Sequence, residues 1–335
     1  MDPVTHGLVG ATSAQLFSDK DTFRTASFIG FIAALAPDLD VFLGSASNPL
    51  LTLELHRQFT HSFIFIPFGA LIVSLILWLF VKKSQRISFK HTYLFSLLGY
   101  STAGLMDYIT SYGVYLFWPF LDERYALNIV SVFDPLLSIG LLITASIALY
   151  KKKKVYSYGL AGWLFLYLCF AGIQKSRVEN IATDLLLAEN DSNSELIIKP
   201  TIGNQILWSV RFVEDGKICG SGIRAGLFST PIIYEGECAA LFDWNSTYKP
   251  FKSTVMYKDI ERFSELSDGL LVRHPIHPNV LGDARYSMLP TTTSPLWGIT
   301  IDTAKTDQHV TFDSYRDASQ EIRTKFLDMI LGRTD

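Results

Sequence analysis

The chain has 335 residues, a formal net charge of −3 and 49 % hydrophobic residues, whereas only 18 % of its residues are charged. This composition favours a membrane protein. With no positive net charge, and no basic stripe interleaved with aromatic residues, nucleic-acid binding is disfavoured.

Apolar residues are concentrated before Arg177, in stretches long enough to be read as membrane spans. A helix needs about 20 apolar residues to cross the hydrocarbon core of a bilayer. The stretches that approach this length are 25–43, 62–81, 92–117, 132–150 and 155–173. A shorter apolar stretch, 4–17, is interpreted as a half-helix packed against protein. The sequence therefore predicts a membrane α-helical bundle with about five spans and a short N-terminal helix.

Lysine and arginine gather in two of the short loops, 82–90 and 151–154, whereas the loops 44–61 and 119–131 each hold a single arginine. Short loops rich in Lys and Arg remain on the cytoplasmic side of a membrane. We therefore expect a multi-pass protein of the inner (cytoplasmic) membrane whose residues after Arg177 lie outside the cytoplasm. The bilayer itself is the first expected partner.

The C-terminal part of the chain has the alternation and turn residues of β-strands. Strands are predicted at 195–198, 205–213 and 217–223, with a turn at Asp215-Gly216, and an amphipathic helix at 314–331. The expected organisation is a transmembrane metal-binding domain over residues 1–177 and a smaller α+β extracytoplasmic domain over residues 178–335. Cys219 and Cys238 would pair in an oxidising compartment, but two free buried thiols are an equal alternative.

Ionisable residues stand in the apolar half, where they are costly. A charge at the centre of a bilayer costs about 2.5–3.5 kcal/mol on insertion scales, so such residues normally pair, line a wet cavity or bind an ion. In the expected topology, separate segments bring these residues to a similar depth at the outer face, with Asp107 about 22 Å up its span. The convergent residues are His6, Asp38, Asp40, His56, His61 and Asp107.

Imidazoles combined with carboxylates are the donor set of zinc, manganese and iron sites, whereas calcium prefers oxygen ligands alone. The candidates outnumber the three protein ligands of an open zinc site, so one or two ions are expected, with zinc favoured. Some candidates would instead orient the ligands. Taken singly, His6 could be a surface residue and the Asp38/Asp40 pair could cap a helix. Asp134-Pro135 is interpreted as an ordinary N-cap.

Four motifs carry a resemblance to a known family: Thr5-His6-Gly7, Pro37-Asp38-Leu39-Asp40, His56-Arg57 with Thr60-His61-Ser62, and Met106-Asp107-Tyr108. The chain resembles the YdjM-like family of membrane-bound, metal-dependent hydrolases over about residues 1–175. The resemblance implies functional roles for the six convergent residues and for Arg57. Gln58 departs from the glycine expected there. Asp283-Ala284-Arg285-Tyr286 is similar to a short motif in the family's variable tail.

The expected function is metal-assisted hydrolysis at the outer membrane face, on a lipid-linked or amphiphilic ester or phosphoester. Asp40 is expected to act as general base or second-metal ligand, and Arg57 to hold an anionic substrate oxygen. One alternative is an ion- or proton-binding transporter, because intramembrane carboxylates also serve there. Another is a structural membrane protein whose metal ties the helices together.

Overall fold

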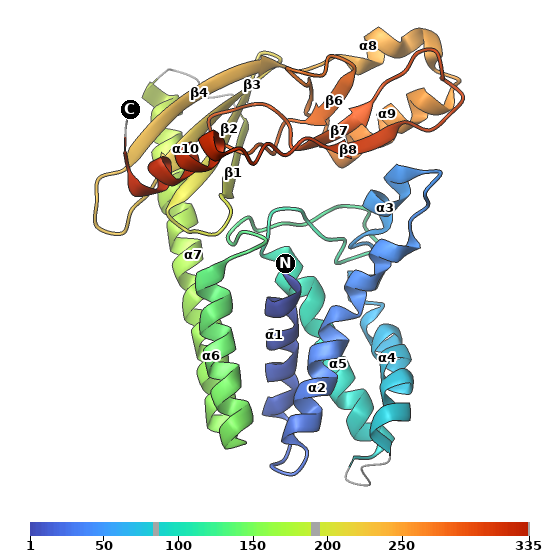
Figure 1. Cartoon of the computed structure of the whole chain (residues 1–335), viewed down its shortest axis with the longest axis vertical. Coiled ribbons are helices and arrows are strands. Elements are labelled where there is room, and N and C mark those ends of the chain that lie inside the picture. Colours follow the sequence, from blue (N-terminus) through green and yellow to red (C-terminus); the bar gives the residue numbers. More distant parts are fainter. Residues whose placement is uncertain (83–86, 189–194, 334–335) are drawn as a thin grey trace. The chain divides into compact units, whose positions relative to one another are not determined.

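The computed structural model describes residues 1–82, 87–188 and 195–333. They form two compact units (Figure 1). Unit 1 comprises Met1–Leu43, Leu55–Ile173 and Ile202–Asn204, and unit 2 comprises Gly44–Glu54, Gln174–Thr201 and Gln205–Asp335.

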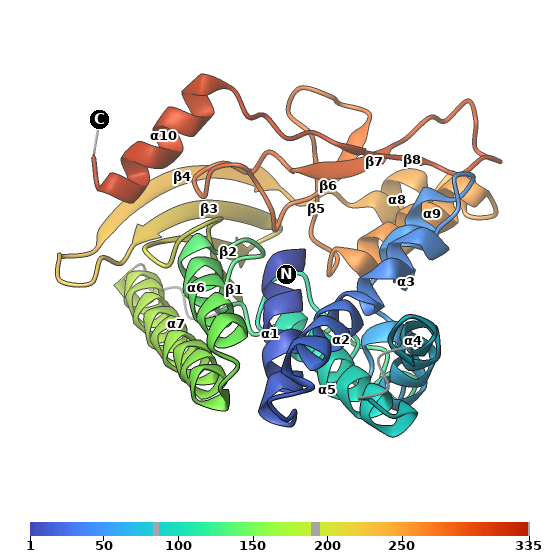
Figure 2. The ribbon, with the colours of Figure 1, turned by 60° about the horizontal axis from the view of Figure 1, so that its bottom comes forward.

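Unit 1 is helical, and its first helix packs against three others. The helix α1 contacts α2, α5 and α6, while α5 also packs on α2 and α4 (Figure 2). The elements of unit 1 are α1 (Pro3–Leu16), α2 (Phe23–Leu35), η1 (Pro37–Leu43), η2 (Phe59–His61), α4 (Ile66–Val81), α5 (Phe89–Tyr108), α6 (Pro135–Lys151) and the first part of α7 (Lys154–Ala188).

Glycines allow α1, α2 and α5 to approach one another closely. A Cβ atom on Gly30 of α2 would lie 2.3 Å from the carbonyl oxygen of Gly10 on α1. A Cβ atom on Gly99 of α5 would lie 2.4 Å from the carbonyl oxygen of Gly30. Neither contact leaves room for a side chain, so Gly30 and Gly99 cannot be replaced without moving the helices apart. The same three helices carry, or lead directly into, the segments that hold His6, Asp38 and Asp107.

Side-chain caps mark the beginnings of several helices. Asp134 accepts a hydrogen bond from the backbone N–H of Leu137 at 3.2 Å, and Pro135 occupies the first turn of α6. The predicted N-cap at Asp134 is therefore confirmed. The second carboxylate oxygen of Asp134 accepts a hydrogen bond from the hydroxyl of Tyr167 at 2.6 Å, which connects α6 to α7.

The prediction of about five membrane spans is wrong. By length and composition, two helical segments in the described part of the chain can cross a membrane, Phe23–Leu43 and Lys154–Leu186. A third span is possible if Pro49–His61 and Ile66–Val81, which are bent by 91° to each other, act as one. The expected orientation relied on loops that alternate between the two sides of the membrane, and this alternation lacks its full set of spans. Lys83 and Arg86, which entered that orientation, lie outside the described residues.

Two of the predicted spans fail for different reasons. The stretch 92–117 is not one helix, since α5 ends at Tyr108. In addition, the polar residues Thr92 and Ser96 of α5 are buried inside the protein. The stretch 132–150 is shortened at Pro135, so α6 has only 17 residues. A long, mostly apolar stretch was therefore not sufficient evidence for a span.

Unit 2 contains two four-stranded antiparallel sheets, in the orders β1-β2-β3-β4 and β5-β6-β7-β8. The strands are β1 (Glu195–Pro200), β2 (Leu207–Glu214), β3 (Lys217–Arg224), β4 (Ile232–Ala240), β5 (Leu271–Arg273), β6 (Val280–Asp283), β7 (Trp297–Thr300) and β8 (Thr311–Ser314). In addition to the second part of α7, the helical elements of this unit are α3 (Pro49–Leu55), α8 (Trp244–Tyr248), η4 (Lys249–Phe251), α9 (Val255–Leu266) and α10 (Gln320–Leu331).

The strand predictions for β1, β2 and β3 are confirmed, including the hairpin between β2 and β3. Glu214 pairs with Lys217, and Asp215 and Gly216 between them have φ angles of 46° and 71°. Positive φ at both central residues is the geometry of a tight two-residue hairpin turn. Cys219 and Cys238 pair across β3 and β4 as a disulfide, which selects one of the two alternatives left open by the sequence.

Candidate metal centre

The two carboxylates of the Pro37–Asp40 motif point to opposite edges of one imidazole ring. The helix α2 ends before Pro37, and the tighter η1 begins there. In a helix, residues two apart diverge. Asp38 consequently reaches Nε2 of His61 at 3.4 Å, while Asp40 lies 3.5 Å from Nδ1 of the same ring.

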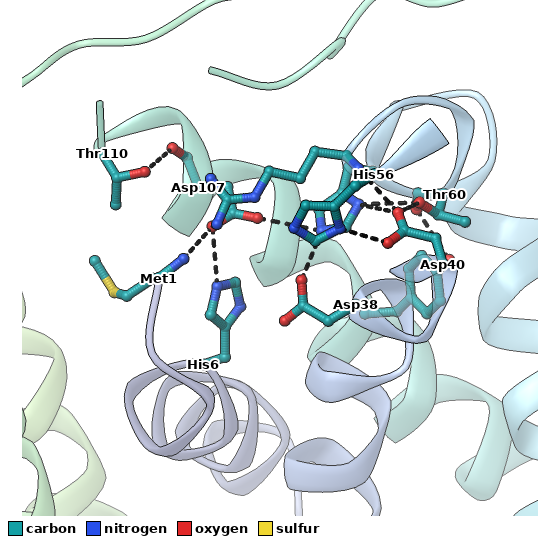
Figure 3. Close-up of polar contacts among 11 residues, drawn as sticks. Met1, His6, Asp38, Asp40, His56, Thr60, Asp107 and Thr110 are labelled. Atoms are coloured by element: carbon teal, nitrogen blue, oxygen red, sulfur yellow. Dashed lines mark hydrogen bonds and ion pairs between the residues drawn. The ribbon is translucent and has the colours of Figure 1, made fainter. Parts of the chain in front are cut away.

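Asp107 completes a buried group around Nε2 of His61. It comes from the last turn of α5, and its Oδ2 atom lies 3.2 Å from His61 Nε2. One potential ligand atom each from Asp38, His61 and Asp107 lies within 4.8 Å of the others (Figure 3). His61 and Asp107 are buried, and Asp38 is half-buried.

The donor atoms at this point have the spacing of metal ligands. Ligands about 2.1 Å from a tetrahedral ion lie roughly 3.4 Å from one another. The His61 Nε2 atom is 3.2 Å from Asp107 and 3.4 Å from Asp38. Among the described residues, neither His61 Nε2 nor Asp107 Oδ2 has a hydrogen-bond partner of acceptable geometry, although both are buried. Asp38, His61 and Asp107 can therefore hold a metal ion.

Hydrogen bonds around Asp40 determine which nitrogen of His61 carries the proton. The single hydroxyl hydrogen of Thr60 goes to Asp40 Oδ2, at 2.5 Å. In the contact of 3.0 Å between Thr60 Oγ1 and His61 Nδ1, the threonine oxygen must then accept and Nδ1 must donate. With Nδ1 as a donor, Nε2 of His61 faces two carboxylates, an arrangement that is stabilised either by a second proton on the ring or by a cation between the three groups.

Asp40 itself accepts three hydrogen bonds from its neighbours. In addition to the hydrogen bond from Thr60, its oxygens accept hydrogen bonds from Nδ1 of His56 at 2.7 Å and from the backbone N–H of Arg57 at 2.9 Å. A carboxylate at the far edge of a ligating imidazole is the usual partner that fixes its tautomer and orientation. The structure therefore places Asp40 and His56 behind His61, on the side away from Asp38 and Asp107.

The other oxygen of Asp107 is surrounded by donors. Oδ1 lies 3.2 Å from His6 Nε2 and 3.1 Å from Arg57 Nη2, and the amino group of Met1 also pairs with it. His6 Nδ1 and Arg57 Nε and Nη1 are buried and have no hydrogen-bond partner within the described ranges. The site thus places two guanidinium nitrogens that have no hydrogen-bond partner in the described part of the chain beside the candidate metal ligands.

The loop before η2 is held in an unusual backbone conformation. Arg57 has a φ angle of 66°, a region that non-glycine residues rarely adopt. This conformation directs the N–H of Arg57 to Asp40, and the guanidinium to within 5.7 Å of the Tyr112 ring centre. Gln58, where the family resemblance led us to expect glycine, has a negative φ of −88° and does not require glycine.

The predicted residues therefore fall into three groups in space, although their roles stay predictions. Asp38, His61 and Asp107 converge, His6 and Arg57 lie against Asp107, and Asp40 with His56 lies against the far edge of His61. No role was predicted for Thr60, although it stands in one of the four motifs, and Tyr100 was not singled out. The hydroxyl of Tyr100 donates to the carbonyl of Thr60 at 2.9 Å and ties η2 to α5. Thr60 could have been found because it directly precedes His61, but Tyr100 had no comparable signal.

Comparison with known proteins covers the same half of the chain. The profile described as YdjM inner membrane protein matches residues 1–178. The chain is also similar to the uncharacterized protein YfhP of Bacillus subtilis, with 29 % identity over 217 residues. That similarity covers 60 % of this chain and 62 % of YfhP, so the chain spans less than two thirds of the relative it matches. No solved structure matches the chain significantly. Because the profile covers more than half of the chain and every residue of the candidate site, the chain belongs to the YdjM family of inner membrane proteins.

Proposed function

We propose that unit 1 is a membrane-bound, metal-dependent hydrolase whose ion is held by Asp38, His61 and Asp107. The observation that carries this proposal is the position of His61 Nε2, which is buried, has no hydrogen-bond partner of acceptable geometry among the described residues and lies 3.4 Å from Asp38 and 3.2 Å from Asp107. Zinc is the proposed ion, because it accepts one imidazole and two carboxylates in tetrahedral geometry. Manganese and iron use similar donors.

Three protein ligands leave a coordination position for water or substrate, as in catalytic zinc sites. A structural site would instead have a closed sphere of four protein ligands. Bound there, the ion would act as a Lewis acid that polarises a scissile ester or phosphoester and acidifies water. The remaining functions belong to the protein's own side chains.

Arg57 is the proposed substrate-binding residue. Its Nε and Nη1 groups are buried and lack hydrogen-bond partners within the described residues, while Nη2 is fixed by Asp107. N–H groups of a guanidinium donate strong hydrogen bonds to the anionic oxygens of a phosphate or carboxylate. An anionic oxygen on the substrate would therefore satisfy donors that are otherwise buried and unsatisfied. This chemistry supports an amphiphilic phosphoester as substrate.

Asp40 is proposed to position His61 rather than to act as general base. Its oxygens accept hydrogen bonds from His56, Arg57 and Thr60, and it lies at Nδ1 of His61, on the ring edge away from Asp38 and Asp107. A general base must lie within hydrogen-bond reach of the reacting water. His6 is assigned the corresponding role at Asp107, where its Nε2 holds the oxygen that does not face His61.

The proposed location of unit 2 is outside the cytoplasm. Disulfides persist in oxidising compartments and are rare in the cytoplasm. The Cys219–Cys238 disulfide therefore supports the orientation expected from the basic loops.

The decisive experiment combines metal analysis with an activity assay on the full chain in detergent. We expect one zinc per chain and hydrolysis of a chromogenic phosphodiester that chelation removes and zinc restores. His61→Ala and Asp107→Asn should lose both the ion and the activity, with unchanged circular dichroism. The matched control is His91→Ala, an exposed histidine on α5. Wild-type activity in a His61→Ala protein that contains no metal would refute the proposal.

A further inference from the structure

The loop between β3 and β4 ends in two adjacent apolar side chains that project from unit 2. Phe228 is fully exposed and Leu227 is 53 % exposed. Single exposed apolar residues are common on protein surfaces and need no explanation. A pair at a loop tip becomes informative when the loop is held in a defined place.

The base of this loop is attached to α7 by buried hydrogen bonds. Nε2 of Gln174 donates to the carbonyls of Ala225 and Gln205, both at 2.9 Å. Nη2 of Arg177 donates to the carbonyl of Gly226, the residue before the tip, at 3.1 Å. On the other side of the tip, Nη1 of Arg224 contacts Oγ of Ser229 at 3.1 Å. The tip is therefore held at one level of α7.

Gln174 and Arg177, to which the loop is attached, come directly after the exposed apolar residues of α7 in the chain. Phe165, Leu166 and Ile173 are each more than 60 % exposed and belong to the candidate span Lys154–Leu186. From Ile173 to Arg177 the helix rises only about 6 Å. The headgroup layer adds roughly 5–8 Å on each side of the hydrocarbon core. The loop is consequently attached to the part of α7 that would pass through this layer.

The surroundings of the tip suit a lipid surface better than open water. Nε of Arg224, the arginine that also contacts Ser229, donates a hydrogen bond to the carbonyl of Ile330 at 2.8 Å. The last turn of α10 therefore lies next to Arg224. Leu327 and Leu331 on this helix are 56 % and 58 % exposed. Apolar side chains beside arginine are typical of segments that lie in the headgroup region of a membrane.

We propose that the Leu227–Phe228 tip inserts into the headgroup boundary of the bilayer that α7 enters, and so anchors unit 2 to the lipid surface. The occupant of this apolar surface is lipid, because the tip is attached to α7 where the helix changes from apolar to polar residues. This inference does not depend on the proposed hydrolase activity.

The test is a depth measurement on the full chain in vesicles of phosphatidylethanolamine and phosphatidylglycerol. Cys169 is replaced by serine, and an environment-sensitive fluorophore is attached to Phe228→Cys. Thr303→Cys, in the exposed β7–β8 loop, is the matched control. Phe228 is fully exposed, so its replacement removes no internal contact.

We expect blue-shifted emission at position 228 and at least two-fold quenching by lipids that carry a nitroxide near the headgroup. The label at position 303 should instead be quenched by aqueous iodide. Equal quenching of both labels by iodide would overturn the proposal. Shielding of the label at 228 from both quenchers would also overturn it, because a protein partner would then cover the tip.

Discussion

The carboxylate of Asp40 lies 3.5 Å from Nδ1 of His61, on the ring edge opposite to the one that faces Asp107. One histidine therefore has a carboxylate that accepts three other hydrogen bonds on one side and the candidate ligands on the other. This arrangement separates the residues that would touch an ion from those that orient the ligand.

Asp40→Asn should weaken metal binding without removing it. An amide is a weaker acceptor than a carboxylate for the proton on Nδ1, and loss of such a partner typically costs 10–100-fold in metal affinity. Competition with a chelator measures this change. The control is Asp134→Asn, a buried carboxylate that caps α6 in the same unit. Unchanged affinity in Asp40→Asn would mean that Asp40 does not act through His61.

His56→Ala should retain one ion per chain and lose less than about 10-fold in affinity. The His56 side chain is 34 % exposed and contacts Asp40 rather than the group of candidate ligands. Elemental analysis distinguishes this outcome from a site with two ions, in which the wild type would hold two and the variant one. The second result would restore the sequence-based prediction that His56 is a ligand.

Replacing both cysteines of the disulfide by serine should lower the free energy of unfolding of unit 2 by about 3 kcal/mol. The estimate follows from closure of a loop by cysteines 19 residues apart. Urea unfolding, followed by a probe in unit 2, measures it. Cys169→Ser is the control, because Cys169 is a free, exposed cysteine. An unchanged midpoint in the double variant would show that the hydrogen bonds of β3 and β4 suffice.

Lys199→Met should stabilise unit 2 at neutral pH and remove part of its pH dependence. Lys199 is 8 % exposed, and its ammonium group lies 3.6 Å from the ring centre of Tyr286. Burial lowers the pKa of Lys199 well below its ordinary value, and the charge of Arg285 lowers it further. The unfolded chain therefore binds this proton more tightly, so the destabilising contribution is present at pH 7 and disappears above a pH of about 10.4.

The measurable quantity is the difference in unfolding free energy between wild type and variant. As the pH rises towards about 10, the unfolding free energy of the wild type should increase relative to that of the variant by up to about 1.4 kcal/mol per pH unit. Lys217→Met, at the exposed start of β3, is the control and should show no such slope. A difference that does not vary with pH would contradict a lowered pKa at Lys199.

Much of the candidate site followed from residue chemistry alone. A carboxylate such as Asp107, with apolar neighbours on both sides, is costly without a partner, and this cost predicted that partners exist. The roles of Asp38 and Asp40 could not be separated in this way, because both are acidic residues of one short motif. Only the change from α2 to η1 at Pro37 shows that they reach opposite edges of His61.

The fold was predicted only in part. The hairpin at Asp215-Gly216 has a local signal, since few residues adopt positive φ at low cost. The second sheet of unit 2 has strands of only three or four residues and was not predicted. In α5, hydropathy alone could not reveal that Thr92 and Ser96 face protein instead of lipid.

The disulfide joins the last two strands of the first sheet, and β4 is the edge strand of that sheet. An edge strand offers unpaired backbone groups to any passing chain, and a strand that detaches can exchange into a neighbouring molecule. A covalent link between Cys219 and Cys238 keeps β4 on β3 even when the hydrogen bonds between them open briefly. Reduction should therefore expose unit 2 to domain swapping and aggregation before it causes global unfolding.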